Sequence, residues 1–379
     1  MHLGIDASNI RQGGGVTHII QLLNEAKPEK FGISHITIWC PKNLVKQLPS
    51  RPWLTIKVEH WLDRSLMVRL LWQQFILPKR LLHNLCDALL APGGTLPIFC
   101  LIPTITICQN MLPFEPSQVK LFGRFSLMRL KMFLLRLSHG RSFKRADGII
   151  FLTDYAKNMV FNAIGEISGR FSIIPHGVEE RFFQKPRKQI DFIEFNSTRP
   201  FKLLYVSAIM PYKHQIEVAQ AVYELKTEGF YIEVNFVGPP YKKYYDDFNK
   251  VRQKLDSKDE FIHYLGEKPF NQVHSLYQDA DFFIFASSCE NLPNILIETM
   301  ASGLPIASSN LGPMLEVLGD AAIYFNPCDV KSIKESIRLS ITNVELRRSL
   351  SNFGRQRAQN YSWNTTATQT LKFISGFKE

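Results

Sequence analysis

The chain has 379 residues, of which 45% are hydrophobic and 21% are charged, and it contains six cysteines. This composition excludes a disordered chain, a collagen and a small disulfide-stapled scaffold, and the length suits two domains with buried cores. No stretch reaches the roughly 20 uninterrupted apolar residues of a spanning helix, and the first residues lack the features of a signal peptide. We therefore expect a cytoplasmic protein whose scattered cysteines are mostly buried thiols.

The positive charge is concentrated in the first half of the chain. Lys and Arg number 45 against 34 Asp and Glu, a net charge of +11. Residues 1–190 hold 25 basic and 12 acidic side chains, whereas residues 191–379 hold 20 and 22. The asymmetry indicates two functional units, one of which faces an anionic partner. No nucleic-acid-binding motif accompanies the charge, so no nucleic acid partner is expected.

The densest basic region, residues 119–146, interleaves basic with apolar side chains and contains no acid. Such a helix can lie in the headgroup region of an anionic membrane. It can equally be a core helix whose long basic side chains reach water. The basic residues that we assign to a membrane or an acceptor are Lys120, Arg124, Arg129, Lys131 and Arg136.

Short apolar strands alternate with helices through the first half. The predicted strands are 3–8, 35–41, 54–59, 88–92, 104–110, 148–153 and 172–177, and the predicted helices are 16–26, 64–86, 119–146 and 154–163. Strands that are apolar on both faces and joined by helices are typical of a parallel, doubly wound α/β sheet.

Residues 179–200 break this alternation with charges and prolines, and we interpret them as a linker. The alternation then restarts, with strands at 202–208, 231–238, 261–266, 282–287, 305–309 and 322–326 and helices at 214–229, 241–257, 270–278, 294–302, 313–318, 329–342, 344–359 and 361–376. The prediction is two Rossmann-like domains, 1–190 and 191–360, followed by a C-terminal segment, 361–379. Their strands' carboxyl ends would face an interdomain ligand cleft.

Two glutamates mark the region after strand 282–287. Glu290 lies in the strand-to-helix loop, and Glu298 lies about one turn inside the next helix. Carboxylates accept pairs of hydrogen bonds from vicinal hydroxyls, and a helix N-terminus suits a phosphate. The pattern indicates a sugar joined through phosphate to a nucleoside, although a glutamate near a helix start often only complements the helix dipole.

The region 282–322 resembles the retaining family 4 glycosyltransferases of the GT-B fold, with their E-x7-E motif. The matching sequence is ASSCENLPNILIETMASGLPIASSNLGPMLEVLGDAA. The resemblance extends to the amino-terminal glycines, the segment His176-Gly177-Val178 and the strand, loop and lysine that end at Lys213. It includes Tyr361-Ser362-Trp363, which precedes a helix that in this family crosses back onto the first domain.

The resemblance implies a role for each matching residue. Glu290 would hold the donor sugar's hydroxyls, Glu298 would bind the ribose, and the amides of Asn294 and Ile295 would lie near the diphosphate. Lys213 would neutralise the leaving diphosphate, although Ser207 and Ala208 occupy the positions of the family's Gly and Arg. The loop with Gly14 and Gly15 would lie against the donor diphosphate and the acceptor.

Other positions are open to two interpretations. Gln109 and Asn110 replace a His-Asp pair found in many members; Gln109 cannot exchange protons, whereas Asn110 can still orient a sugar. His176 is either a ligand contact or a structural histidine.

Asp279 and Asp281 have the spacing of a metal-binding D-x-D motif. Because they directly precede a strand, we interpret them as residues that cap the turn between helix and strand. No metal and no cofactor beyond the donor are therefore expected.

Together these features predict a retaining hexosyltransferase. It would use a UDP- or GDP-sugar and an acceptor hydroxyl on a polyisoprenyl-diphosphate-linked saccharide, in bacterial surface polysaccharide synthesis. It would bind peripherally to the inner face of the cell membrane. Two alternatives stay open: a nucleotide-sugar 2-epimerase of the same fold, and a catalytically degenerate member that binds a membrane or partner.

Overall fold

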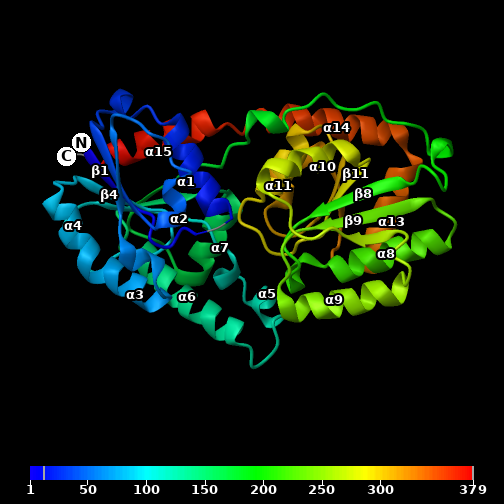
Figure 1. The fold of residues 1–379 in the computed structure, drawn as a ribbon, viewed down its shortest axis with the longest axis horizontal. Helices are drawn as coiled ribbons and strands as arrows, with labels where there is room; N and C mark the ends of the chain where they lie inside the picture. Colours follow the sequence, from blue (N-terminus) through cyan, green and yellow to red (C-terminus); the bar gives the residue numbers. More distant parts are fainter. Residues whose placement is uncertain (12, 378–379) are drawn as a thin grey trace. The chain divides into compact units, whose positions relative to one another are not determined.

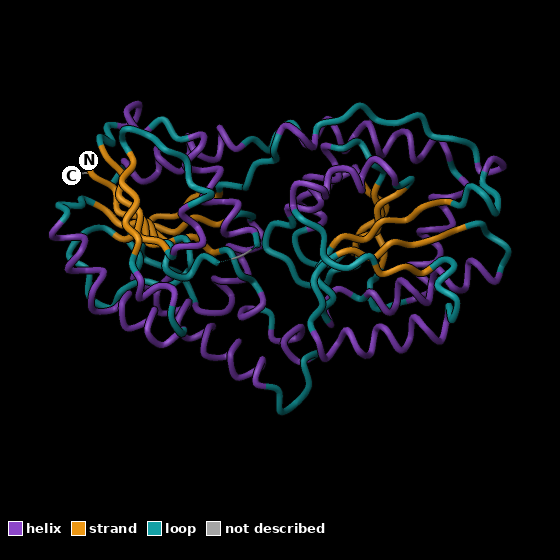
Figure 2. The backbone as a smooth tube through the Cα atoms, viewed as in Figure 1, coloured by secondary structure: helices purple, strands orange, loops and turns teal. Residues whose placement is uncertain are grey.

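The computed structural model describes residues 1–11 and 13–377 (Figure 1). Its internal contacts divide the chain into two units. Unit 1 comprises Met1–Val119, Gly123–Gly177 and the chain from Ser362 onward, and unit 2 comprises Lys120–Phe122 and Val178–Tyr361. In each unit the strands lie inside and the helices outside (Figure 2), because the strands are apolar on both faces.

Unit 1 is built on a seven-stranded parallel sheet of order β3-β2-β1-β4-β5-β6-β7. Its strands are β1 (His2–Asp6), β2 (His35–Cys40), β3 (Leu54–Val58), β4 (Ala88–Ala91), β5 (Thr104–Cys108), β6 (Gly148–Phe151) and β7 (Arg170–Ile173). Its helices include α1 (Gly14–Glu25), α2 (Lys42–Val45), α3 (Leu66–Leu71), α4 (Leu77–His83), α5 (Pro116–Lys120), α6 (Leu127–Arg145), α7 (Asp154–Ile164) and α15 (Trp363–Ser375).

Unit 2 is built on a six-stranded parallel sheet of order β10-β9-β8-β11-β12-β13. Its strands are β8 (Phe201–Val206), β9 (Ile232–Val237), β10 (Ile262–Tyr264), β11 (Phe282–Phe285), β12 (Ile306–Ser309) and β13 (Ala322–Phe325). Its helices include α8 (Gln215–Thr227), α9 (Lys242–Leu255), α10 (Val273–Asp279), α11 (Asn294–Ala301), α12 (Met314–Leu318), α13 (Val330–Thr342) and α14 (Val344–Ala358). The predicted fold class, two doubly wound parallel sheets, is confirmed.

Each sheet has a point where the strand order reverses. In unit 1 the first strand β1 lies between β2 and β4, and in unit 2 the first strand β8 lies between β9 and β11. Open α/β sheets bind ligands at the carboxyl ends of the strands beside such a point, because the two adjacent connections run to opposite faces. The loops after β8 and β11 are therefore the places in unit 2 where a ligand is expected.

Two long predicted helices are interrupted. The helix expected over 119–146 ends with α5 at Lys120 and restarts as α6 at Leu127, because Gly123 adopts a left-handed φ of 87° and Ser126 caps the new helix. Lys120 and Arg124 therefore lie outside α6. The helix expected over 64–86 contains a π-helical turn, Trp72–Ile76, which ends two residues before Pro78, a residue that cannot donate a backbone hydrogen bond.

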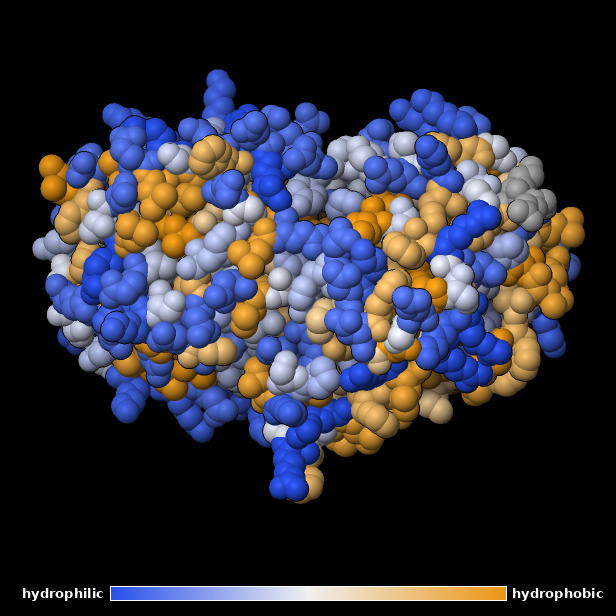
Figure 3. Space-filling model, turned by 180° about the vertical axis from the view of Figure 1, so that it is seen from behind, coloured by the Kyte–Doolittle hydropathy of each residue, from blue (hydrophilic) through white to orange (hydrophobic). Residues whose placement is uncertain are grey.

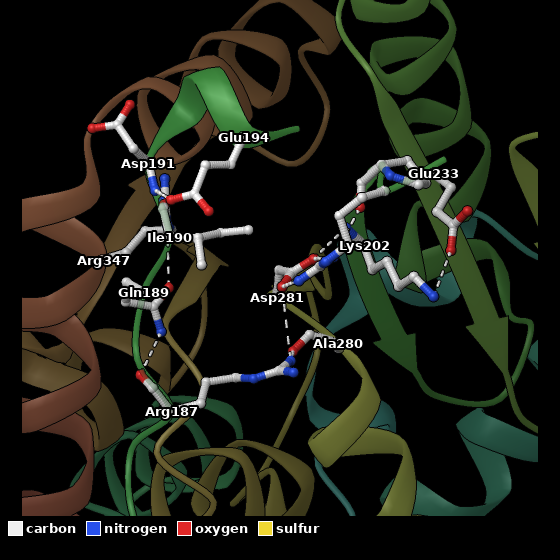
Figure 4. Close-up of polar contacts among 12 residues, drawn as sticks. Arg187, Gln189, Ile190, Asp191, Glu194, Lys202, Glu233, Ala280, Asp281 and Arg347 are labelled. Atoms are coloured by element: carbon white, nitrogen blue, oxygen red, sulfur yellow. Dashed lines mark hydrogen bonds and ion pairs between the residues drawn. The ribbon is translucent and has the colours of Figure 1, made fainter. Parts of the chain in front are cut away.

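The segment 179–200, expected as a linker, is fastened to unit 2 (Figure 4). The Arg199 guanidinium pairs with both oxygens of Asp281 at 2.9 and 2.8 Å, and Arg187 lies 3.7 Å from the same carboxylate. The buried Arg347 donates to the Gln189 side chain at 3.2 Å.

Asp281 directly precedes β11, at the amino end of the sheet and opposite the loops after β8 and β11. Its two partners Arg199 and Arg187 give the carboxylate a structural role. Across the part of the chain that the structure describes, no cluster of three or more His, Cys, Asp and Glu side chains could hold a metal ion.

The chain returns to unit 1 at its end. Helix α15 packs against α1, and the backbone of Gly177 approaches Trp363 so closely that a Cβ at position 177 would lie 2.0 Å from the Trp363 amide nitrogen. The last two residues of the predicted segment 361–379 lie outside the described residues. Among the helices of residues 1–11 and 13–377, none is long and apolar enough to span a bilayer.

Candidate active site

The strand-order reversal of unit 2 brings Lys213 and Glu290 together. Lys213 follows β8, Glu290 follows β11, and the lysine Nζ forms an ion pair with the glutamate Oε1. Their side chains are only 10% and 16% exposed. The ammonium also lies 5.1 Å from the ring centroid of Phe285 and 5.5 Å from that of Tyr212, within cation–π range. A buried cation and a half-buried carboxylate thus meet at the predicted ligand end of the sheet.

The two loops that carry this pair are tied to each other. The Tyr205 hydroxyl donates to the Lys213 carbonyl and accepts from the Ala286 amide at 3.2 Å. The Ser288 amide donates to the Tyr212 carbonyl at 2.8 Å. His214, whose φ of 51° turns the chain into α8, places its Nε2 2.9 Å from the Ser288 hydroxyl. These contacts hold Lys213 and Glu290 on a rigid support.

Ser207 takes part in the structure of its own loop. Gln215 donates from Nε2 to the Ser207 hydroxyl at 3.0 Å and to the Ala208 carbonyl at 2.9 Å. Gly238 passes so close that a Cβ there would lie 2.1 Å from the Ser207 carbonyl oxygen. Ala208 contributes no charge at the position where the resembling family has arginine.

Glu298 lies in a different environment from Glu290. Its side chain is buried in α11 and accepts a hydrogen bond from the Tyr277 hydroxyl at 3.2 Å. The pKa of Glu298 is raised to about 8, mainly by burial and also by the nearby Glu179, against the lowering effects of the Tyr277 hydrogen bond and Arg181. At pH values below this pKa the Glu298 carboxyl is mostly protonated, and a protonated carboxyl can both donate and accept hydrogen bonds.

Asn294 and Ile295 are the first two residues of α11 and are half-buried. The preceding residue, Pro293, supplies no side-chain cap to the helix. A helix start without a side-chain cap suits an anion, because its first N–H groups have no partners within the helix. Asn294 and Ile295 begin this helix between the positions of Glu290 and Glu298 in the chain.

The glycine loop of unit 1 approaches Gln109. Gly13 has a φ of 71° and precedes α1, which begins at Gly14. A Cβ added to Gly15 would lie 3.0 Å from the Gln109 Oε1. Asn110 is exposed, and its Oδ1 accepts from the Leu112 amide at 3.2 Å, which is the contact expected of a residue that stabilises the turn. Gly14, Gly15 and Asn110 thus share the carboxyl end of the first sheet.

His176 lies inside unit 1. Its side chain is buried, and its ring centroid lies 4.7 Å from that of His18 and 5.3 Å from that of Trp363. Burial, together with the neighbouring His176, holds the pKa of His18 well below its usual value. The histidine rings and Trp363 thus join the segment before Gly177 to α1 and α15.

Sequence reasoning missed Tyr277 and His214, which contact Glu298 and Ser288. The contact between Tyr277 and Glu298 joins positions 21 residues apart through the fold of α10 against α11. A tyrosine within an amphipathic helix carries no local signal of such a role, so a single sequence does not identify it.

The structure has two parallel sheets, each with a point where the strand order reverses, and an ion pair at the carboxyl end of one of them. These features define the class, which is a two-sheet α/β protein of the GT-B fold. The Thermosynechococcus elongatus sucrose-phosphate synthase superposes with a TM-score of 0.75 at 14% identity, covering 98% of this chain and 97% of that one. Anabaena HepE in complex with UDP and glucose superposes with a TM-score of 0.71 at 15% identity, over 98% and 99%.

Residues 186–357, which lie within unit 2, match the family model for glycosyl transferases group 1. The Escherichia coli O-antigen chain mannosyltransferase B is 28% identical over 168 residues, which cover 44% of this chain and 44% of that protein. The chain thus spans about half of the length of such relatives.

Proposed function

We propose that the protein is a retaining glycosyltransferase. It would transfer a hexose from a UDP- or GDP-sugar to a hydroxyl of a lipid-linked saccharide in bacterial surface polysaccharide synthesis. Three findings support this proposal: the match of residues 186–357 to the group 1 family model, the UDP and glucose in the fold neighbour from Anabaena, and the O-antigen mannosyltransferase among the relatives. The last of these favours mannose as the sugar.

The observation that carries the proposal is the buried pair of Lys213 and Glu290. Taking two charges out of water is costly, and replacing such a pair by apolar residues is often neutral or stabilising. A chemical role explains why both charges are present. In the proposed site the hydroxyls of the donor sugar form hydrogen bonds with Glu290 in place of its contact with Lys213. The Lys213 ammonium then interacts with the departing diphosphate.

The proposed reaction relies on positioning and charge stabilisation. Glu290 would hold the sugar hydroxyls beside the reacting carbon, Glu298 would bind the ribose, and the start of α11 at Asn294 and Ile295 would meet the diphosphate. When the bond from the sugar carbon to the diphosphate oxygen breaks, negative charge develops on that oxygen, and Lys213 would stabilise it. The acceptor oxygen would form the new bond on the same face, with its proton passing to the leaving phosphate.

We further propose that unit 1 binds an anionic membrane through a docking face on α3, its π turn, the loop 98–101 and α6. Large apolar side chains of this face are half or more exposed: Met67 (67%), Leu71 (54%), Phe75 (66%), Phe99 (79%), Leu101 (86%), Leu130 (56%), Phe133 (57%), Leu134 (56%) and Leu137 (56%). Figure 3 shows, from behind, how apolar patches lie among polar ones on the molecular surface. Exposed apolar patches of this kind mark interaction sites.

The elements of the docking face are joined to one another. The Ile98 amide donates to the Gln74 side chain at 2.8 Å, and Arg145 donates from α6 to the Ile98 carbonyl at 3.3 Å. A cavity of about 550 Å³ lies between them, lined by Leu134, Leu137 and other residues of this face. With Arg129, Lys131 and Arg136 on the same helix, apolar and basic groups occur together, as anionic membranes require.

Calorimetry with nucleotide sugars tests the transferase proposal. UDP-glucose and GDP-mannose are titrated separately into the wild-type protein and into Glu290→Gln and Glu298→Ala variants. We expect saturable binding of one nucleotide sugar by the wild type and at least tenfold weaker binding by Glu298→Ala. Failure of the wild type to bind any nucleotide sugar would overturn the proposal. Binding without transfer to any acceptor, but with conversion at the sugar's second carbon, would favour an epimerase.

A further inference from the structure

Two arginine side chains of unit 1 each connect the loop after β1 with the segment 62–69, near the carboxyl end of β1. Arg11, in the loop after β1, donates from Nη2 to the Leu62 carbonyl at 2.5 Å. Arg69, on α3, donates from Nη1 to the Ser8 carbonyl at 3.4 Å. The two side chains run in opposite directions between these segments, and the charge of Arg11 is close enough to act on Arg69.

This arrangement places like charges together. Burial lowers the pKa of Arg69, and the charge of Arg11 lowers it further. Within residues 1–11 and 13–377, no acidic side chain forms an ion pair with either arginine. Two adjacent cations without a counter-ion cost free energy unless an anion joins them.

The nearest buried acid, Asp6, is already engaged. Its Oδ1 accepts from the Ser8 amide at 2.9 Å, and its Oδ2 accepts from the Gln73 amide group at 2.5 Å. Gln73 lies one turn after Arg69 in the chain and donates to the Thr95 carbonyl at 3.1 Å as well. Asp6 thus fixes the loop after β1 and the π turn, and it forms no ion pair with either arginine.

Two buried polar atoms on the segments that the arginines connect, the loop after β1 and α3, lack hydrogen-bond partners among the described residues. One is the Arg69 Nε, which needs an acceptor, and the other is the Asn9 Oδ1, which needs a donor. An unsatisfied buried polar group destabilises the fold, so such atoms indicate a missing group. A molecule that offers both an anionic oxygen and a hydroxyl would satisfy both atoms.

We propose that Arg11 and Arg69 form a binding site for the phosphate or diphosphate of the acceptor substrate, with Asn9 accepting a hydrogen bond from one of its hydroxyls. That the ligand is the acceptor rests on the proposed function, whereas the presence of a phosphate in the ligand is inferred from the two arginines. Guanidinium groups bind phosphate oxygens through paired, charge-assisted hydrogen bonds. The donor's diphosphate is the other source of the same chemistry, and Lys213 is its proposed partner in unit 2.

Inorganic diphosphate is the probe that tests this site. It is titrated by calorimetry into the full-length protein with and without saturating UDP, which occupies the proposed donor site. The variants are Arg11→Gln, Arg69→Gln and Arg69→Lys, with Arg64→Gln as the matched control. Arg64 is exposed, lies five residues before Arg69 and stacks on the Trp61 ring at 5.4 Å.

We expect diphosphate to bind the UDP-saturated wild type and Arg64→Gln equally, and Arg11→Gln and Arg69→Gln at least tenfold more weakly. Arg69→Lys should recover part of the affinity, because it keeps the charge and loses Nε. Unchanged affinity in both glutamine variants, or no diphosphate binding beside UDP, would refute the site. If UDP does not bind, GDP replaces it in the titration. If neither nucleotide binds, the donor proposal fails alone, and the titration without nucleotide still measures diphosphate binding at the two arginines.

Discussion

The two glutamates of the E-x7-E spacing differ through their surroundings. Glu290 has a cationic partner in Lys213, whereas Glu298 has the neutral hydroxyl of Tyr277 and a buried position. Burial raises the pKa of Glu298 to about 8. The same side chain therefore forms an ion pair at one position and accepts a hydrogen bond in a buried setting at the other.

Glu298→Gln should flatten the pH dependence of stability. The folded-state pKa of Glu298 is about 8, above the unfolded value of 4.5, so the native state binds this proton more tightly. Its contribution to stability is therefore lost as pH rises from about 4.5 through 8, by an amount on the order of a few kcal/mol. Guanidinium unfolding at pH 5 and pH 8 should show a larger decrease in the wild type than in Glu298→Gln. The exposed Glu345→Gln serves as control and should follow the wild type.

Lys213 and Glu290 should behave as a coupled pair. Lys213→Met leaves a buried carboxylate without its cation, and Glu290→Gln leaves a buried ammonium without its anion, so each should cost about 3–5 kcal/mol. The double variant should be much less destabilised than the sum, because neither buried charge remains. Urea unfolding of the four proteins gives the coupling energy. Additive losses would show that the two charges do not interact.

These residues differ in how far the sequence predicts them. Glu290, Glu298 and Lys213 stand at fixed distances from strand ends, so their spacing is readable along the chain. The hydrogen bond from Tyr277 to Glu298 and the pairing of Ser207 with Gln215 depend on how α10 and α8 pack, which no local pattern encodes. The environment that sets a pKa is therefore the part that the sequence cannot supply.

At the level of elements, alternation of apolar strands with helices predicts both sheets, because burial on both faces leaves a clear sequence pattern. The interruptions of the long helices were not predicted. Gly123 ends a helix only because it adopts a left-handed conformation, and the apolar pattern continues across it. Periodicity locates an element, whereas a single backbone angle decides where it is broken.

Gly177→Ala should destabilise the contact between the strand-end segment of unit 1 and α15. The added Cβ would lie 2.0 Å from the backbone nitrogen of Trp363, and a backbone atom at a helix start cannot move aside cheaply. We expect a loss above about 2 kcal/mol in the free energy of unfolding. Gly354→Ala is the matched control, since its Cβ would meet Met300 at an ordinary 3.5 Å and helix propensity favours alanine by up to about 1 kcal/mol. Equal effects of both substitutions would contradict the close-approach argument.

At the level of the whole molecule, the net charge of +11 has an uneven origin. Unit 2 pairs many of its basic residues internally, as in the contacts of Arg199 with Asp281 and of Arg338 with Glu228. In unit 1 the chain between Glu115 and Asp147 contains no acid, and α6 presents Leu134 and Leu137 at 56% exposure. A basic and apolar surface on one unit is the arrangement that a membrane-bound substrate favours.

Replacing Arg129, Lys131 and Arg136 with serine should therefore weaken membrane binding. Each basic residue near an anionic surface contributes about 1 kcal/mol, so three replacements should reduce co-sedimentation with phosphatidylglycerol vesicles about a hundredfold. Serine at Lys242, Lys243 and Lys250 on α9 removes the same charge from unit 2 and should leave sedimentation unchanged. Phe99→Ser with Leu101→Ser should weaken binding even at high salt, because burial of apolar surface is not screened. Equal losses from the α6 and α9 replacements would mean that net charge alone, rather than the docking face, attracts the vesicles.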